Sequence, residues 1–203
     1  MKHRVNIIST QEIFNNSFFR IEESKLHHEL PNGEMSPEIT RLNFVRGDSV
    51  AALVHDGEND TFVFTYQFRY PTTKHDLGWI HEIPAGSLPN GKDPIAHMRE
   101  EMMEEIGYTV QELVPIKTFY VSPGGTSERI ILYYARVSPK DQKSAGGGLA
   151  HEGEFVERVT MKADDALKLL DTVDVGDAKT IIALQWFKLN RKKQGFFAKL
   201  FGS

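Results

Sequence analysis

The stretch from residue 83 to residue 108, IPAGSLPNGKDPIAHMREEMMEEIGY, constrains the fold more than any other, because it outlines one complete helix. Asp93 suits the N-cap position and Pro94 suits the first helical position. Gly107 suits the left-handed residue that follows a helix. Apolar residues recur at helical spacing between these ends: Ile95, Met98, Met102 and Ile106. The pattern predicts a helix with one face in a hydrophobic core.

Four glutamates occupy the last part of this predicted helix: Glu100, Glu101, Glu104 and Glu105. The helix dipole disfavours acidic residues near a C-terminus, and carboxylates three or four residues apart repel each other. Glu101, Glu104 and Glu105 stand at i, i+3 and i+4, so they point roughly the same way. Three convergent carboxylates form a hard-oxygen site for Mg²⁺, Mn²⁺ or Ca²⁺. The alternative is a solvated acidic helix face, which is the better interpretation of the glutamates taken alone.

The composition narrows the class of protein. The chain has 203 residues, of which 40% are hydrophobic and 26% charged, as in an ordinary globular protein of one domain. The formal net charge of −4 disfavours nucleic acid as the main partner, because a phosphate backbone usually requires a basic surface. With no cysteine, the chain has no disulfide, thiolate metal site or cysteine nucleophile. No segment has the apolar length of a membrane span or a signal peptide, so we expect a cytoplasmic protein.

The rest of the chain predicts strands on both sides of the helix and two further helices near the end. Short strands and a turn at 31–33 are expected within 5–45, and helices at 163–171 and 177–193. Other strands are expected at 49–56, 61–70, 79–88, 113–122 and 129–138, and after the Gly-rich loop near 146–148. The order of strands, helix, strands and helices predicts an α+β fold with a sheet packed against helices.

The residues around the glutamates decide how to interpret them. The segment resembles the Nudix box, G-x5-E-x7-R-E-U-x-E-E-x-G-U, where U is a bulky apolar residue. The matching positions are Gly86, Glu101, Met102, Glu104, Glu105, Gly107 and Tyr108. Lys92 stands where the family has Glu, and Glu100 stands where the family has the Arg that orients one of the glutamates. We expect Lys92 to compensate by pairing with Glu100 or with another carboxylate across the loop.

Further motifs resemble the nucleoside-diphosphate-sugar branch of the Nudix hydrolases: YQFRYP, EIPAG, YVSPGGTSE, AGGGLAHEGE and AKTIIALQWF. This branch contains ADP-ribose pyrophosphatases, GDP-mannose hydrolases and UDP-glucose diphosphatases, and the spacing of the glycine motifs is most similar to the last two. The resemblance implies a Nudix α/β/α sandwich with a mixed sheet and a homodimer in which N-terminal strands help cover the partner's site. We therefore expect a dimerising β region at 1–45, a Nudix domain at 46–190 and a basic tail at 191–203.

The resemblance also implies which residues form the site. The expected ligands of Mg²⁺ or Mn²⁺ are the Ala85 carbonyl, Glu101, Glu104, Glu105 and Glu154. The expected catalytic residues are Glu105, Glu154 and Glu152, the last two on a Gly-rich loop where simple solvated charge is the alternative. The expected substrate-binding residues are Arg69, Glu82 and Glu128. A guanidinium matches phosphate bidentately, although a surface ion pair is the alternative for Arg69, and a polar strand end is the alternative for Glu82.

The function implied is metal-dependent cleavage of a nucleoside diphosphate sugar to a nucleoside monophosphate and a sugar phosphate. The preferred base and sugar stay open. One alternative is a degenerate Nudix domain that binds a nucleotide without cleaving it, as the departures at Lys92 and Glu100 suggest. A second concerns the tail, whose FFAKLF segment suits a membrane surface or a partner groove, or else ends the chain without a role. The histidines show no metal-ligand spacing; His27, His28 and His55 are expected on the surface.

Overall fold

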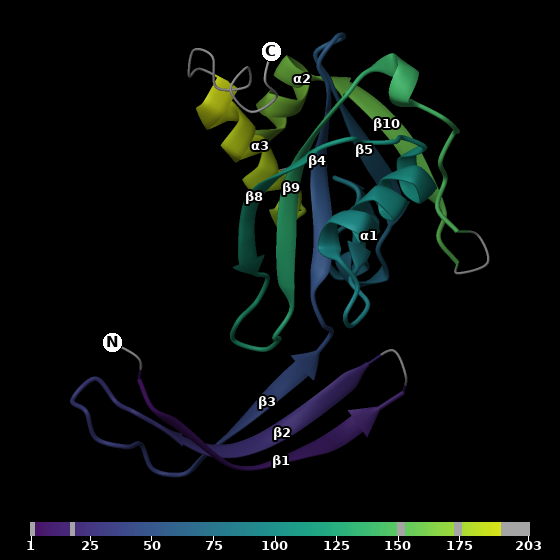
Figure 1. Cartoon of the computed structure of the whole chain (residues 1–203). Coiled ribbons are helices and arrows are strands. Elements are labelled where there is room, and N and C mark those ends of the chain that lie inside the picture. The colour runs from purple at the N-terminus through teal and green to yellow at the C-terminus, as the bar shows by residue number, and fades with distance from the viewer. Residues whose placement is uncertain (1–2, 17–18, 150–152, 173–175, 192–203) are drawn as a thin grey trace. The chain divides into compact units, whose positions relative to one another are not determined.

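The computed structural model describes residues 3–16, 19–149, 153–172 and 176–191, and the chain divides into two compact units (Figure 1). The smaller unit contains Met1–Asp48 and Tyr120–Arg129, and the larger contains Ser49–Phe119 and Ile130–Ser203. A loop between two strands of the larger unit therefore belongs with the N-terminal strands.

The smaller unit is a three-stranded antiparallel sheet in the order β1-β2-β3. Its strands are β1 (Val5–Asn15), β2 (Arg20–His28) and β3 (Ile39–Val45). The loop at 120–129 joins this sheet because Phe44 donates its backbone N–H to the Gly125 carbonyl at 2.9 Å. The Thr126 hydroxyl also donates to the Phe44 carbonyl, at 2.8 Å. Strand β1 is exposed along its whole length, which leaves a sheet edge and several apolar side chains uncovered in this chain.

The larger unit is built on a mixed sheet in the order β10-β5-β4-β9-β8, with β6 paired to β5 and β7 paired to β4. Its strands are β4 (Ser49–Asp56), β5 (Thr61–Phe68), β6 (Trp79–Glu82), β7 (Ala85–Ser87), β8 (Leu113–Tyr120), β9 (Arg129–Val137) and β10 (Val156–Lys162). Strands β4 and β9 are parallel, whereas β4 pairs antiparallel with β5 and β7. The strands expected from the sequence are confirmed.

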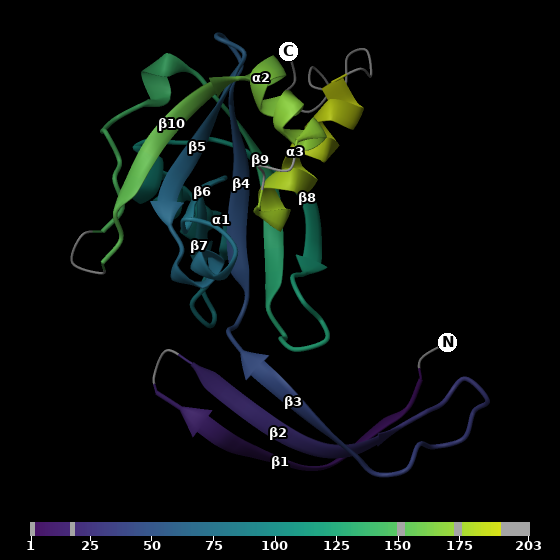
Figure 2. The ribbon, with the colours of Figure 1, turned by 180° about the vertical axis from the view of Figure 1, so that it is seen from behind.

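Helices cover both faces of this sheet, as Figures 1 and 2 show from opposite sides. They are α1 (Pro94–Glu101), the π-helical turn η2 (Met102–Ile106), α2 (Ala163–Lys168) and α3 (Ala178–Arg191), with 3-10 turns at Tyr70–Lys74, Pro139–Asp141 and Leu169–Asp171. Alternate residues of β4 face opposite cores: Val50 packs in the cluster of Met98, and Leu53 packs in the cluster of Phe187. The predicted α+β class and the α/β/α sandwich are confirmed.

One surface prediction is wrong. His55 lies under α3, where its Nδ1 is 2.7 Å from the Tyr134 hydroxyl and its Nε2 is 3.0 Å from Asp60 Oδ1. Its side chain is only 12% exposed, because Phe62 and Phe187 pack against the ring. Strand alternation alone did not show that α3 would cover this position.

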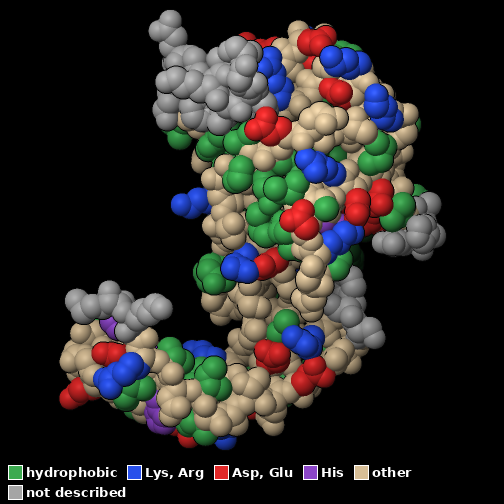
Figure 3. Space-filling view, in the orientation of Figure 1, with side chains coloured by type: hydrophobic (Ala, Val, Ile, Leu, Met, Phe, Trp, Pro, Cys, Tyr) green, Lys and Arg blue, Asp and Glu red, His purple; other side chains and the backbone are tan. Residues whose placement is uncertain are grey.

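The outer surface carries charges of both signs. On the face drawn in Figure 3, Lys and Arg side chains are interspersed with Asp and Glu side chains. None of the helices in the described ranges is long and apolar enough to cross a membrane.

Candidate active site

The glutamate-bearing helix starts and ends at the predicted residues. Asp93 is the N-cap, and its Oδ2 accepts a hydrogen bond from the Ala96 N–H at 2.8 Å. Pro94 opens the helix, and Gly107 ends it with a φ of 76°, in the left-handed region where a side chain would be strained. The local sequence therefore sets both ends of the element that carries the acidic cluster.

The last turn differs from the regular α-helix that the spacing predicts. Residues Met102–Ile106 form a π-helical turn, which is wider than an α-turn and is often found at functional sites. In this turn Glu105 is buried, at 3% exposure, while Glu104 is exposed. The three carboxylates of the i, i+3, i+4 pattern thus have unequal access to solvent.

The Gly-rich loop caps this turn. The N–H groups of Gly147 and Gly148 donate to the carbonyls of Glu105 and Glu104 at 2.9 and 3.1 Å. A Cβ on Gly146 would lie 2.3 Å from the Glu105 carbonyl oxygen, so only glycine fits this approach. Arg158 also donates to the Ile106 carbonyl, at 3.0 Å. These donors satisfy free carbonyls of the helix end.

Two backbone positions lie against the carboxylates of buried Glu105 and partly buried Glu101. The Ala85 N–H donates to Glu105 Oε2 at 3.0 Å. Gly86 lies directly against Glu101, because a Cβ at Gly86 would be 2.0 Å from Glu101 Oε1. Strand β7 and the helix therefore approach each other so closely that a residue with a side chain would displace the carboxylate of Glu101.

Burial and mutual repulsion raise the proton affinity of this cluster. Burial raises the pKa of Glu105 to about 8, and the charges of Glu101 and Glu154 add to the effect. Burial likewise raises the pKa of Glu101 to about 7, with further contributions from Glu104 and Glu154. Glu154, which is far downstream of the helix in sequence, thus acts on the same electrostatic site.

The solvent flank of the same helix carries the two departures from the expected box. Lys92 forms an ion pair with Glu100, which confirms the predicted pairing. Hydrogen bonds from Lys92 and His97 hold the pKa of Glu100 below its usual value. On the other side of the ring, His97 Nε2 lies 3.1 Å from Glu101 Oε1 and 2.8 Å from the Ser87 carbonyl oxygen. A network of polar and charged side chains therefore connects the loop, the helix and the partly buried Glu101.

Arg69 and Glu82 form a second network beside the cluster. Arg69 Nε donates to Glu82 Oε2 at 2.7 Å, and Lys179 of α3 forms an ion pair with Glu82 Oε1. Lys179 was not identified from the sequence, where the available signal is a lysine in the first turn of a helix that continues with an apolar stretch. Both oxygens of Glu82 are engaged by cations, which favours a role in holding Arg69.

The comparisons with known proteins agree with this geometry. Residues 45–184 match the family model described as the NUDIX domain. The chain belongs to the Nudix family. It is 32% identical over 196 residues to the ADP-ribose pyrophosphatase of Escherichia coli (strain K12), covering 94% of this chain and 91% of that protein. It is 29% identical over 188 residues to the GDP-mannose pyrophosphatase of Citrobacter koseri, covering 92% of this chain and 96% of that protein.

A solved structure, described as the crystal structure of ADP compounds hydrolase, shares the fold with a TM-score of 0.72 at 19% identity. The aligned region covers 95% of this chain and 97% of the chain in that structure. The resemblance to the nucleoside-diphosphate-sugar branch is confirmed, and the protein is a Nudix hydrolase.

The donor set of the Nudix helix suits a divalent cation. Across the described residues, no three His, Asp or Glu side chains already converge as metal ligands, since Glu105 is turned to the Ala85 N–H and Glu101 lies near His97. The chemistry of the site nevertheless fits a hard cation, because buried like-charged carboxylates are costly unless a positive charge offsets them. The elevated pKa values of Glu101 and Glu105 are the expression of that cost.

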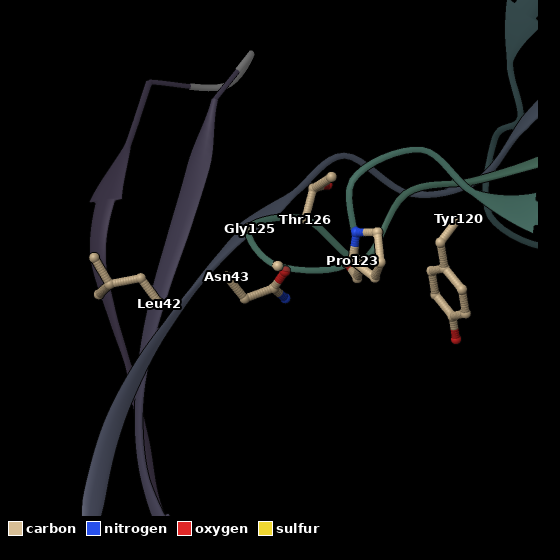
Figure 4. A pocket seen from close by; sticks show the side chains of 8 residues that line it. Leu42, Asn43, Tyr120, Pro123, Gly125 and Thr126 are labelled. Atoms are coloured by element: carbon tan, nitrogen blue, oxygen red, sulfur yellow. The ribbon is translucent and has the colours of Figure 1, made fainter. Parts of the chain in front are cut away.

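Two of the expected site residues are not assigned to this cluster. Glu152 falls outside the described residues. Glu128 belongs to the smaller unit, where its carboxylate is 3.7 Å from Arg46 Nε, so its substrate role stays a prediction. The same unit has a pocket of about 360 Å³ between β3 and the loop at 120–129, shown in Figure 4. It is lined by Leu42, Asn43, Tyr120, Pro123, Gly124, Gly125, Thr126 and Ser127.

Proposed function

We propose that this Nudix hydrolase cleaves the pyrophosphate bond of a nucleoside diphosphate sugar, with Mg²⁺ or Mn²⁺, into a nucleoside monophosphate and a sugar phosphate. The observation that carries the proposal is the pair of buried Glu105 and partly buried Glu101, whose carboxyls have raised pKa values on an element that matches the Nudix box. The names of the relatives, ADP-ribose pyrophosphatase and GDP-mannose pyrophosphatase, support this substrate class.

The residues have distinct roles in this proposal. The cation would be held by Glu101, Glu105 and Glu154, with Glu104 and the Ala85 carbonyl completing the donors. When bound, it supplies charge neutralisation at the diphosphate and a lower pKa for a water ligand.

The remaining roles belong to side chains that contact the substrate or move a proton. Arg69 lies near enough to Glu105 for its charge to lower the pKa of that carboxyl, and it binds a phosphate oxygen of the substrate. Glu154 or Glu152 accepts the proton of the attacking water.

A substrate panel tests the proposal. Purified protein is assayed with ADP-ribose, GDP-mannose and UDP-glucose, each with Mg²⁺ and with Mn²⁺, and the nucleoside monophosphate and sugar phosphate are quantified. We expect turnover of at least one substrate and none when the metal is chelated. The control variant is Glu112→Gln, at an exposed glutamate of the larger unit, which should keep the turnover of the wild type. Binding without turnover supports the degenerate-domain alternative. If neither product forms from any of the substrates, the enzymatic function is overturned.

We also propose that the active form is a homodimer. Strand β1 leaves Val5, Ile7, Ile13 and Phe14 exposed, and an uncovered sheet edge with apolar side chains favours pairing with another chain. Sedimentation velocity is expected to give twice the chain mass of 23.0 kDa. A fully active monomer would contradict this assembly.

A further inference from the structure

A line of alternating charges leads from the Nudix site into the interior of the larger unit. Arg69 Nε is 2.7 Å from Glu82 Oε2, Lys179 pairs with Glu82 Oε1, and Lys179 Nζ is 3.0 Å from Asp177 Oδ1. The side chains of Glu82 and Lys179 are 5% and 8% exposed, whereas that of Arg69 is 42% exposed. Arg69 is therefore the only one of these three side chains with substantial access to a ligand in solution.

The charges of this line balance, and the balance overcomes the cost of burial. Burial acts to raise the pKa of Glu82, but the charges of Lys179 and Arg69 outweigh it and leave this pKa below its usual value. Burial acts to lower the pKa of Lys179, but Asp177 and Glu82 outweigh it and raise this pKa. Both groups are thus charged at neutral pH, and removal of either one leaves the other with a single partner of opposite charge.

The same turn of α3 also holds the backbone of the site. The Thr180 N–H donates to Asp177 Oδ2 at 2.9 Å, and Thr180 Oγ1 accepts the Ile83 N–H at 3.0 Å. Two residues later, the Ala85 N–H donates to Glu105. The segment from Glu82 to Ala85 is therefore fixed by α3 at one end and by the Nudix helix at the other.

We infer that Lys179 is a positioning residue of the pyrophosphate site, which acts through Glu82 to hold Arg69 for contact with a phosphate. The inference rests on the proposed function, in which Arg69 binds the substrate diphosphate. With Lys179 in place, Glu82 has a second cation and Arg69 is held at Nε only. Without Lys179, Arg69 becomes the only cation among the described residues that pairs with Glu82, and a phosphate must compete with this carboxylate for Arg69.

A double-mutant cycle between Lys179 and Arg69 tests this role. Lys179→Met keeps an unbranched side chain that is one atom shorter and removes its charge. We expect KM for the best substrate of the panel to rise on the order of ten-fold, as for loss of a charge-assisted hydrogen bond, with a smaller change in kcat. Because Lys179 acts through Arg69, Lys179→Met should add little to the KM of Arg69→Met. Lys179→Arg, which keeps the charge, should recover part of the loss.

The control is Lys188→Met on the same helix, where the lysine is 44% exposed and lies 3.5 Å from Asp171. It should leave KM unchanged. If Lys179→Met fails to fold, Glu82→Leu combined with Lys179→Met removes both buried charges, a change that proteins often tolerate. This double variant should still show a raised KM, since Arg69 has lost its anchor.

The outcomes separate this inference from the proposed function. The inference alone is overturned if the wild type is active and the KM of folded Lys179→Met, or of the double variant, stays within about two-fold of the wild-type value. Full additivity with Arg69→Met overturns it as well. If the wild type binds but does not cleave, calorimetric dissociation constants of ADP-ribose replace KM in the same cycle. A wild type that neither binds nor cleaves any of the panel overturns both.

Discussion

Glu100 and Glu105 lie five residues apart on one helical segment, yet their carboxyls are in opposite environments. Glu100 is on the solvent flank, where hydrogen bonds from Lys92 and His97 lower its pKa. Glu105 is on the buried flank, where desolvation and the charge of Glu101 raise its pKa to about 8. The comparison shows that glutamates in one run differ in environment. One flank of the helix carries an exposed ion pair, and the other carries carboxylates whose charged form is disfavoured by burial.

The two flanks should therefore respond very differently to substitution. An exposed pair exchanges its interactions with water and contributes little to stability. A buried carboxylate has few substitutes for its partners, so its cost is retained only where a ligand or a function requires it. Substitutions should therefore have effects that decrease from the buried flank to the solvent flank.

The largest effect is expected for Glu105→Gln on the buried flank. The amide keeps the shape and can still accept the Ala85 N–H, but the site loses a negative charge and with it a metal ligand. We expect kcat to fall roughly 100-fold or more, with an unchanged circular dichroism spectrum and a melting temperature no lower than that of the wild type. Near-normal hydrolysis would mean that the helix is only an acidic surface. Glu112→Gln is the exposed control.

Gly86→Ala should have the next largest effect. The added Cβ would lie 2.0 Å from Glu101 Oε1, and the end of that side chain can move away. We expect stability to change little while the Mg²⁺ concentration for half-maximal activity rises roughly 10-fold or more. Manganese binding followed by electron paramagnetic resonance gives a readout without turnover. Gly176→Ala, where no atom of the described residues lies within 4 Å of the new Cβ, is the control, and equal behaviour of the two variants would contradict the prediction.

Lys92→Ala on the solvent flank should have a smaller effect. The Lys92 and Glu100 side chains are 34% and 50% exposed, so their ion pair is screened by water. Removing the cation leaves Glu100 as an added negative charge next to Glu101, and we expect up to a roughly 5-fold weaker apparent Mg²⁺ affinity. Exchanging the charges, with Lys92→Glu and Glu100→Arg together, should restore it. If the exchange does worse than Lys92→Ala alone, the pair is not what organises this flank.

The smallest effect is expected for His55→Gln, which removes a largely covered imidazole and changes the pH dependence of stability. Burial lowers the pKa of His55, the opposite direction to Glu105, because desolvation always disfavours the charged form. The unfolded chain therefore takes up a proton near pH 6.5 before the folded chain does, and stability falls as pH drops below that value. Urea unfolding between pH 5 and pH 8 should show a smaller loss for His55→Gln than for the exposed control His75→Gln. Identical acid sensitivity would contradict the assignment.

Much of the fold was predictable because its signals are local. Asp93, Pro94 and Gly107 specify the ends of the helix through their own backbone preferences and hydrogen bonds. The ion pair of Lys92 with Glu100 was also predictable, since the residues are eight positions apart and of opposite charge. Alternation and turn residues likewise sufficed for the strands of both units.

The tertiary structure decided which of these residues are buried and what they face. Lys179 meets Glu82 across 97 positions of sequence, and no local pattern predicts that an α3 lysine anchors the arginine after β5. The π-helical turn, the docking of Gly146 on Glu105 and the burial of His55 likewise depend on how distant segments pack. The sequence by itself determined the elements and the acidic box, because backbone preferences are local. Packing alone determined the pKa values and the partners of the charges, because desolvation depends on every segment that closes over a residue.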